Sequence, residues 1–260
     1  MPPGTPAQAA GCPVLPSQAT FRALPARMAD RLIVALDVPG VDRARDLLAR
    51  LDGAASFFKL GYWLAFAEGV DRLIADLTRD GRRLFLDAKF HDIGQTVQEG
   101  VARAADRGVS FVTVHAEPQV IAAAVRGARG TDTQILAVTV LTSLTDAHLA
   151  EMGYALSVPE LVARRARQAA ELGAHGIVAS AQDNPAHLRE QAGAPGLLVV
   201  TPGIRSAGDA ANDQQRHATP AAAIRRGADY LVVGRPIIAA ADPAARARAI
   251  IAEMEQGAQS

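Results

Sequence analysis

The chain contains only two lysines, Lys59 and Lys89, beside 25 arginines. Lys89 lies two residues after Asp87 and three before Asp92, in and just after a short apolar run. A lysine ammonium is a compact point charge that can release a proton, which the guanidinium of arginine does not do. The residue types and spacing therefore indicate either a proton-transfer site built from lysines and carboxylates or a structural network of ion pairs.

Asp87 and Lys89 are two residues apart in a segment that predicts an extended strand, so their side chains should project to the same side. Their neighbours are apolar, and a charged pair among apolar residues is costly unless its members are paired. Lys59, from the preceding apolar run, can meet this pair, and together with Asp92 it would complete an alternating Lys–Asp–Lys–Asp set. Flanking carboxylates would keep Lys89 protonated despite partial burial.

Short apolar runs alternate with amphipathic stretches rich in alanine and arginine from residue 31 onward. The predicted strands are residues 32–37, 57–61, 84–89, 111–115, 135–141, 176–180, 197–201 and 230–234. The predicted helices are residues 41–51, 62–79, 95–108, 118–129, 158–172, 184–192, 217–227 and 243–256. Eight strand–helix units predict an α/β protein with a single (β/α)8 TIM barrel. An open doubly wound sheet is the alternative, but the turn after the first strand has no GxGxxG motif.

Composition limits the remaining possibilities. Residues 1–28 are rich in proline and alanine and are predicted to be a disordered tail, and residues 29–260 form the predicted barrel domain. A net charge of zero and an aromatic content of 4% argue against a nucleic-acid partner. No apolar run approaches the length of a membrane span, so no membrane partner is expected. A single cysteine, Cys12, is typical of a reducing compartment, and we expect a cytoplasmic protein.

In a TIM barrel the functional residues lie at the carboxyl ends of the strands, where the loops meet at one mouth. The polar residues at these predicted ends are Asp37, Lys59, Asp87, Lys89, His115, Thr142, Ser180, Arg205 and Arg235. Arg205 follows Gly203, and Arg235 follows Gly234, in the two loops that often bind phosphate in such barrels. Arginine offers a planar fork to phosphate oxygens, and glycine allows close backbone approach. These two loops therefore predict a phosphate site.

Metal and cofactor chemistry finds little support in the sequence. The six histidines show neither H-x-H nor H-x-x-x-H spacing, and there is no GxSxG motif or P-loop. His115 and Glu117 could face the mouth together, but a lone histidine at a strand end is more often structural. We therefore expect neither a metal nor a cofactor.

The segment LDAKFHDIGQT, residues 86–96, resembles the D-x-K-F-x-D-I-x-x-T motif of the orotidine 5′-phosphate decarboxylase family. Further matches in the family's order are ALD at 35–37, FKLG at 58–61, VTVLTS at 138–143, TPGIR at 201–205, DQ at 213–214 and VVGRP at 232–236. Two departures stand out. Gly94-Gln95 replaces a common Pro-Asn pair, and Glu117-Pro118-Gln119 replaces a small glycine-containing turn.

The resemblance implies roles for individual residues. Lys59, Asp87, Lys89 and Asp92 correspond to the family's charged catalytic network, in which Lys89 would give its proton to C6 of the pyrimidine. Asp92, Ile93 and Thr96 correspond to residues that each subunit supplies to the neighbouring site, which implies a homodimer.

The substrate contacts are implied in the same way. Asp37 and Lys59 would bind the ribose hydroxyls, and Thr142 would bind the pyrimidine. The 5′-phosphate would be held by Arg205, Gln214, Gly234 and Arg235.

The activity that the resemblance implies is metal-free decarboxylation of orotidine 5′-phosphate to uridine 5′-phosphate, in pyrimidine biosynthesis. Two alternatives stay open from the residues alone. One is a Mg²⁺-dependent decarboxylase or synthase acting on a sugar phosphate, which shares the D-x-K-x-x-D core. The other is a catalytically silent barrel that binds nucleotides, and that reading predicts a disrupted charge network.

Overall fold

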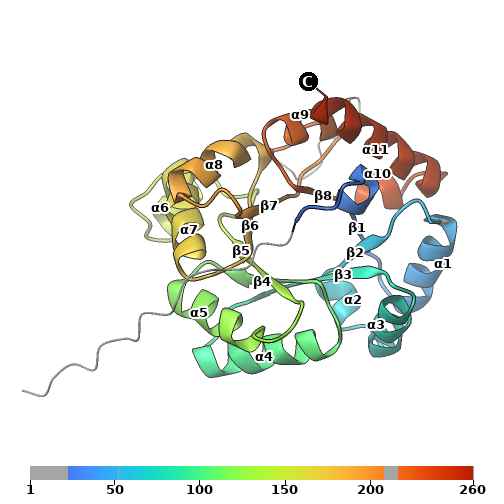
Figure 1. Ribbon diagram of the computed structural model, residues 1–260, viewed down its shortest axis with the longest axis horizontal. Helices are drawn as coiled ribbons and strands as arrows, with labels where there is room; N and C mark the ends of the chain where they lie inside the picture. The colour runs from blue at the N-terminus through green and yellow to red at the C-terminus, as the bar shows by residue number, and fades with distance from the viewer. Residues whose placement is uncertain (1–22, 52, 208–215, 260) are drawn as a thin grey trace, which may run out of the picture.

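Eight parallel strands close into a barrel with the helices outside it (Figure 1). The computed structural model describes residues 23–51, 53–207 and 216–259, so most of the predicted tail lies outside the described residues. Each strand pairs with the next, and β8 pairs with β1. The strands are β1 (Leu32–Ala35), β2 (Phe57–Leu60), β3 (Arg83–Phe90), β4 (Phe111–His115), β5 (Gln134–Val138), β6 (Gly176–Val178), β7 (Leu198–Thr201) and β8 (Tyr230–Val233). The predicted (β/α)8 barrel is confirmed.

The outer ring contains one main helix after each strand and several short ones. The helices are α1 (Val41–Leu51), α2 (Tyr62–Ala65), α3 (Val70–Arg79), α4 (Gly94–Asp106), α5 (Pro118–Gly127), α6 (Asp146–Glu151), α7 (Val158–Glu171), α8 (Pro185–Ala192), α9 (Pro220–Arg225), α10 (Arg235–Ile238) and α11 (Pro243–Ala258). Two 3-10 turns, η1 (Met28–Arg31) and η2 (Ala181–Asp183), complete the set.

One predicted helix is divided in two. The helix expected over 62–79 is interrupted between α2 and α3, where Gly69 adopts a left-handed backbone with φ of 78°. Glycine tolerates this conformation because it has no Cβ atom to clash. The break turns α2 into a short separate element beside the carboxyl end of β2, where its aromatic side chains reach the barrel mouth.

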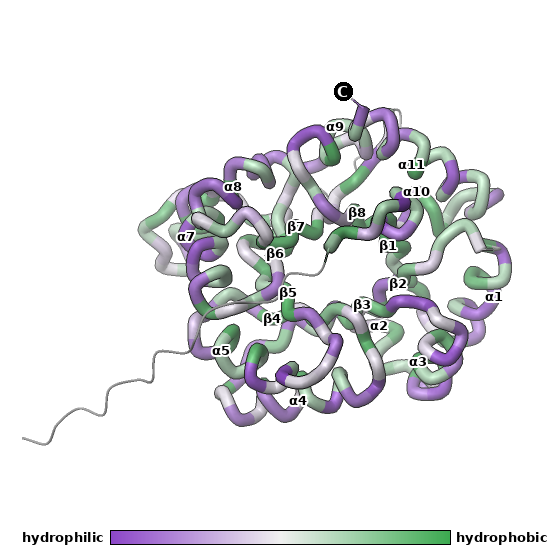
Figure 2. The backbone as a smooth tube through the Cα atoms, in the orientation of Figure 1, coloured by the Kyte–Doolittle hydropathy of each residue, from purple (hydrophilic) through white to green (hydrophobic). Residues whose placement is uncertain are grey.

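Apolar residues form two layers, which explains why the strands are apolar on both faces. The inner layer fills the barrel and contains Ile33, Phe57, Phe85, Phe111, Leu136, Leu198, Val200, Tyr230 and Val232. The outer layer lies between the strands and helices, and α1 contributes Ala44, Leu47 and Leu51, which share one helical face. Figure 2 shows the hydrophobic strands inside a ring of helices with hydrophilic stretches. No helix in the described ranges has the length and apolarity that a bilayer crossing requires.

Candidate active site

A cavity of about 590 Å³ opens at the carboxyl ends of the strands. Eight of the residues that the sequence singled out line it: Asp37, Lys59, Asp87, Lys89, Thr142, Arg205, Gly234 and Arg235. They come from strands or loops on opposite sides of the barrel, so closure of the sheet brings them together. Gln214 lies outside the described residues. His115 and Ser180, also at strand ends, do not contribute to the lining.

Four of these side chains form a continuous chain of alternating charge. Nζ of Lys59 lies 3.0 Å from Oδ1 of Asp37 and 3.4 Å from Oδ2 of Asp87. Nζ of Lys89 lies 2.9 Å from Oδ1 of Asp87. Lys59 and Asp87 are largely covered, whereas Asp37 is about half exposed at the rim. Asp87 therefore receives one ammonium on each of its two carboxylate oxygens.

The balance of burial and charge decides the ionisation of Asp87. Burial alone would raise the pKa of Asp87, but the ammonium groups of Lys59 and Lys89 and a hydrogen bond from Thr113 lower it below its ordinary value. Oγ1 of Thr113 donates this bond to Oδ1 over 2.9 Å. The site therefore holds a fixed negative charge between two fixed positive charges.

Strand β3 is irregular where it presents Lys89. Its pairing with β4 shifts register between Leu86 and Phe90, and Lys89 has a positive φ of 44°, which is rare for a residue other than glycine. The amide of Lys89 donates a hydrogen bond of 3.0 Å to Oγ1 of Thr113. Thr113 thus holds both the strained backbone of Lys89 and the carboxylate of Asp87, a role that nothing in the sequence indicated.

Two residues at the start of α2 complete this side of the cavity. A Cβ atom on Gly61 would lie 2.9 Å from Oδ1 of Asp37 and 3.3 Å from Nζ of Lys59, so a larger residue would have to displace this ion pair. The hydroxyl of Tyr62 donates a 2.9 Å hydrogen bond to the carbonyl of Ala88, and the Tyr62 ring lies 5.7 Å from Nζ of Lys89. Tyr62 is a site residue that the sequence analysis did not identify.

The opposite side of the cavity carries two arginines from the loops after β7 and β8. Arg205 is buried and donates to the carbonyl of Ile204 over 2.7 Å, whereas Arg235 is exposed at the start of α10. Among the described lining residues, four side chains are cationic and two are anionic, which leaves an excess of two positive charges. Such a cavity favours a multiply charged anion.

Three predicted site residues lie outside the cavity of a single chain. Asp92, Ile93 and Thr96 are exposed after β3, and none of them lines the cavity. The carboxylate of Asp92 accepts a hydrogen bond from the amide of Ile93 over 2.6 Å. No ion pair joins Asp92 to either lysine within the described part of the chain, so the alternating set contains Asp37, not Asp92.

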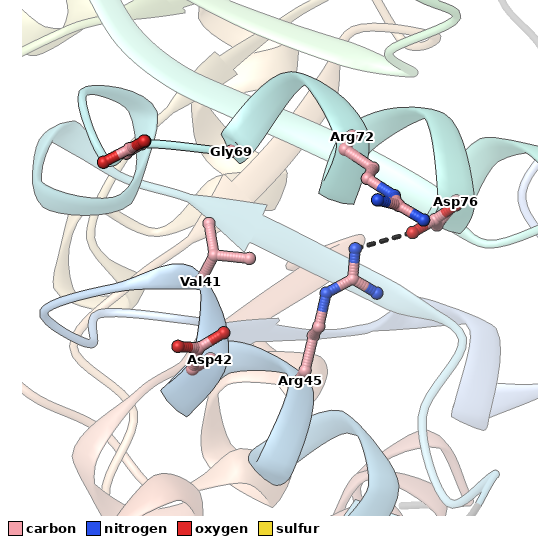
Figure 3. A pocket seen from close by; sticks show the side chains of 7 residues that line it. Val41, Asp42, Arg45, Gly69, Arg72 and Asp76 are labelled. Carbon is pink, nitrogen blue, oxygen red and sulfur yellow. Dashed lines mark hydrogen bonds and ion pairs between the residues drawn. The ribbon is translucent and has the colours of Figure 1, made fainter.

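A second cavity, of about 500 Å³, lies between α1 and α3 on the outside of the barrel (Figure 3). Its lining alternates acidic and basic side chains, and Arg45 binds Asp76 over 2.6 Å. It lies away from the strand ends, and its arginines have acidic neighbours from the same two helices. The cavity at the barrel mouth is therefore the candidate active site.

Comparison with known proteins agrees with this site. Residues 30–250 match the model of the orotidine 5′-phosphate decarboxylase / HUMPS family. The chain is 55% identical over 230 residues to an orotidine 5′-phosphate decarboxylase of Afipia carboxidovorans, covering 88% of this chain and 97% of that protein. It is 57% identical over 226 residues to one of Methylorubrum extorquens, covering 87% and 96%. The crystal structure of the Lactobacillus acidophilus orotidine 5′-phosphate decarboxylase superposes with a TM-score of 0.76 at 36% identity, covering 86% and 99%.

The hydrogen bond from Thr113 can be tested through the ionisation of Asp87. We expect a pKa below the ordinary value of 3.8 for Asp87 in the wild type, and a higher pKa in Thr113→Val, because the substitution removes a donor to the carboxylate. Carboxyl ¹³C NMR titration measures both. Asp76 is the internal control, since Arg45 and Arg79 lower its pKa far from Thr113.

The lowered pKa of Asp87 also predicts how the free energy of unfolding changes at acid pH. Because the folded pKa of Asp87 is lowered, its ionisation stabilises the fold above the ordinary pKa, and this contribution is lost as the pH falls through the lowered value. An Asp87 pKa at or above 3.8 in the wild type would contradict the proposed charge arrangement.

Proposed function

Because this chain belongs to the orotidine 5′-phosphate decarboxylase family, we propose that it converts orotidine 5′-phosphate to uridine 5′-phosphate at the barrel mouth. It is a carboxy-lyase, and its place in pyrimidine biosynthesis follows from the family. The observation that carries the proposal is the charge chain of Asp37, Lys59, Asp87 and Lys89 inside the cavity. An intact network argues against a silent nucleotide-binding barrel.

The chemical difficulty of the reaction explains why the site is charged. When CO₂ leaves C6 of the pyrimidine, the electron pair of the broken bond stays in the plane of the ring and cannot delocalise into a neighbouring carbonyl. A preorganised ammonium beside that carbon stabilises the developing negative charge. Lys89 supplies this ammonium in our proposal, and its pairing with Asp87 fixes its position before the substrate binds.

The second step is a proton transfer. Nζ of Lys89 gives one proton to the C6 electron pair, which forms the new C–H bond of the product and leaves a neutral amine that solvent reprotonates. The electron pair and proton therefore balance without an oxidant or reductant. Asp87 would lie near the departing carboxylate, and the repulsion between the two negative charges is relieved when CO₂ leaves.

The charge of the cavity agrees with the charge of this substrate. Orotidine 5′-phosphate carries a phosphate and a carboxylate, and the cavity has an excess of two positive charges. Arg205 and Arg235, with the backbone of Gly234 and with Gln214, would hold the phosphate. Apolar wall residues such as Val138 and Val178 would contact the ring beside Thr142, and Asp37 and Lys59 would bind the ribose.

A homodimer would complete the site. Asp92, Ile93 and Thr96 are exposed and outside the cavity of their own chain, which is where residues must lie if they enter a neighbouring site. In this arrangement Asp92 would bring a further carboxylate to the lysines of the other subunit. The expected cytoplasmic location stays a prediction.

We predict that Lys89→Ala lowers kcat by at least about a thousandfold, because both charge stabilisation and proton donation are lost. Lys89→Arg keeps the charge, but a guanidinium does not release its protons at neutral pH, so it should be similarly inactive. The assay follows the loss of orotidine 5′-phosphate absorbance without added metal, and uridine 5′-phosphate binding verifies an intact site. Near-normal turnover in either variant would exclude the role of Lys89. A requirement for Mg²⁺ would favour the sugar-phosphate alternative.

For the phosphate site, we expect Arg235→Ala to raise KM about ten- to hundredfold, the effect of losing a charged hydrogen bond or two. Arg248→Ala on the exposed face of α11 removes an equal charge away from the cavity and is the matched control. Steady-state kinetics at constant ionic strength measures both. An equal KM change in the two variants would show a general charge effect and would remove Arg235 from the phosphate site.

The shared site predicts complementation between two inactive chains. Asp92→Asn and Lys89→Ala should each be inactive alone. After random mixing of subunits, about a quarter of the sites would combine an intact Lys89 with an intact Asp92 from the other chain. We therefore expect activity to return to about a quarter of the wild-type value under those conditions. No recovery, with mixed dimers verified by mass spectrometry, would show that Asp92 acts in its own chain or that no shared site exists.

A further inference from the structure

Three side chains of metal-binding types meet beside the mouth, outside the cavity. His91 follows β3, His115 ends β4, and Glu117 immediately precedes α5. One ligand atom from each lies within 4.8 Å of the others. None of the three lines the active-site cavity. They are separated by as many as 26 residues in the chain, so only the pairing of β3 with β4 brings them together, and a search for histidine spacing could not find them.

The hydrogen-bonding capacity of this cluster is largely unused. Oε2 of Glu117 is buried without a hydrogen-bond partner and lies 3.7 Å from Nε2 of His91. Neither imidazole ring has a hydrogen bond to any side chain or backbone group that the structure describes, although the two rings lie 5.0 Å apart. A buried carboxylate oxygen without a hydrogen bond is costly, so Oε2 can accept a bond from a further group between the histidines.

The second carboxylate oxygen of Glu117 is already fixed. Nη2 of Arg165 lies 3.1 Å from Oε1, and Nη1 of Arg165 donates to the carbonyl of Thr139. The arginine thus orients Glu117 with Oε2 toward the histidines, as groups behind a metal ligand commonly do.

We propose that His91, His115 and Glu117 form a binding site for a divalent transition metal of the Zn²⁺ class. Two imidazoles and one carboxylate suit Zn²⁺ and its neighbours, whereas Mg²⁺ and Ca²⁺ prefer oxygen ligands alone. Bonds of about 2.0–2.2 Å in a tetrahedral site place ligand atoms about 3.4 Å apart, so the side chains must approach by about 1 Å. His91 is half exposed on a loop and can make this movement, and water would take the fourth position.

A metal here would cross-link the ends of β3 and β4. His91 lies between Lys89 and Asp92, so the ion would tie the segment that carries both to the start of α5. The site differs from the decarboxylation site because none of its three ligands lines the cavity, and the reaction proposed above uses no metal. Lys89 and Arg165 add positive charge near the site, which lowers its affinity for a cation. In a site of limited affinity, the loss of one ligand gives a measurable rise in the dissociation constant.

Zn²⁺ titration of the full chain by isothermal calorimetry, with Mg²⁺ in parallel, tests the proposal. We expect one Zn²⁺ per chain and no comparable Mg²⁺ binding. His91→Ala and Glu117→Gln should each raise the Zn²⁺ dissociation constant at least about tenfold. His187→Ala is the matched control, because His187 pairs with Glu190 over 3.3 Å in an exposed pair that gains no third ligand among the residues described. Cys12→Ser excludes binding by the single thiol.

Comparison of the variants shows whether the three proposed ligands bind Zn²⁺. Equal weakening in His91→Ala and Glu117→Gln, with His187→Ala and Cys12→Ser unchanged, supports the site. Substitution of Co²⁺ should add a visible ligand-field spectrum that disappears in His91→Ala. Wild-type affinity in His91→Ala, loss of binding in His187→Ala or Cys12→Ser, or no saturable binding at all would each overturn the proposal. Retained decarboxylase activity verifies that the His187→Ala and Cys12→Ser control chains are folded, and thermal unfolding compared with the wild type verifies the folding of His91→Ala and Glu117→Gln.

Discussion

The arrangement of charged side chains at the mouth of this barrel depends on one carboxylate held between two ammonium groups. Two unit charges about 4 Å apart at an effective dielectric near 20 attract by roughly 4 kcal/mol. Asp87 has two such partners, and together with the hydrogen bonds from Lys89 and Thr113 they outweigh its burial, so its pKa lies below the ordinary value. Removing either lysine would leave a covered charge with half its compensation, which is strongly unfavourable. The positions of Lys59 and Lys89 are therefore coupled through Asp87.

The surrounding backbone is shaped to keep this arrangement. A regular β3 would continue its pairing with β4, but the register shift and the positive φ of Lys89 turn the strand locally. A left-handed backbone at a lysine costs on the order of 1–3 kcal/mol and persists only when its surroundings fix it. Thr113 on the neighbouring strand does so through two hydrogen bonds, and Gly61 leaves the space that the Asp37–Lys59 pair occupies. Strain, hydrogen bonding and charge are thus concentrated at one strand end.

The sequence predicted the barrel and most of the cavity because both follow from local patterns. All eight strands lie within two or three residues of their predicted bounds, and most of the polar residues at their ends meet at the mouth as the topology requires. The features that the sequence did not indicate depend on contacts between residues that are far apart in the chain. Thr113 looks like an ordinary residue of a buried strand, and the cluster of His91, His115 and Glu117 arises from strand pairing. The short helices α6 and α10 lack the length that gives a periodic signal.

The surface beside the mouth agrees with the proposed homodimer. Apolar side chains after two neighbouring strands are exposed: Trp63 and Phe66 after β2 by 71% and 85%, and Ile93 after β3 by 72%. Exposed apolar groups gathered around a charged cavity are typical of an interface. Asp92 lies beside Ile93, so a partner that covered Ile93 would also bury Asp92 against itself. A buried carboxylate requires a cation. In the proposed dimer, the cavity of a second copy, with its excess of positive charge, would offer that cation, and the same contact would bury the apolar rim and neutralise the site.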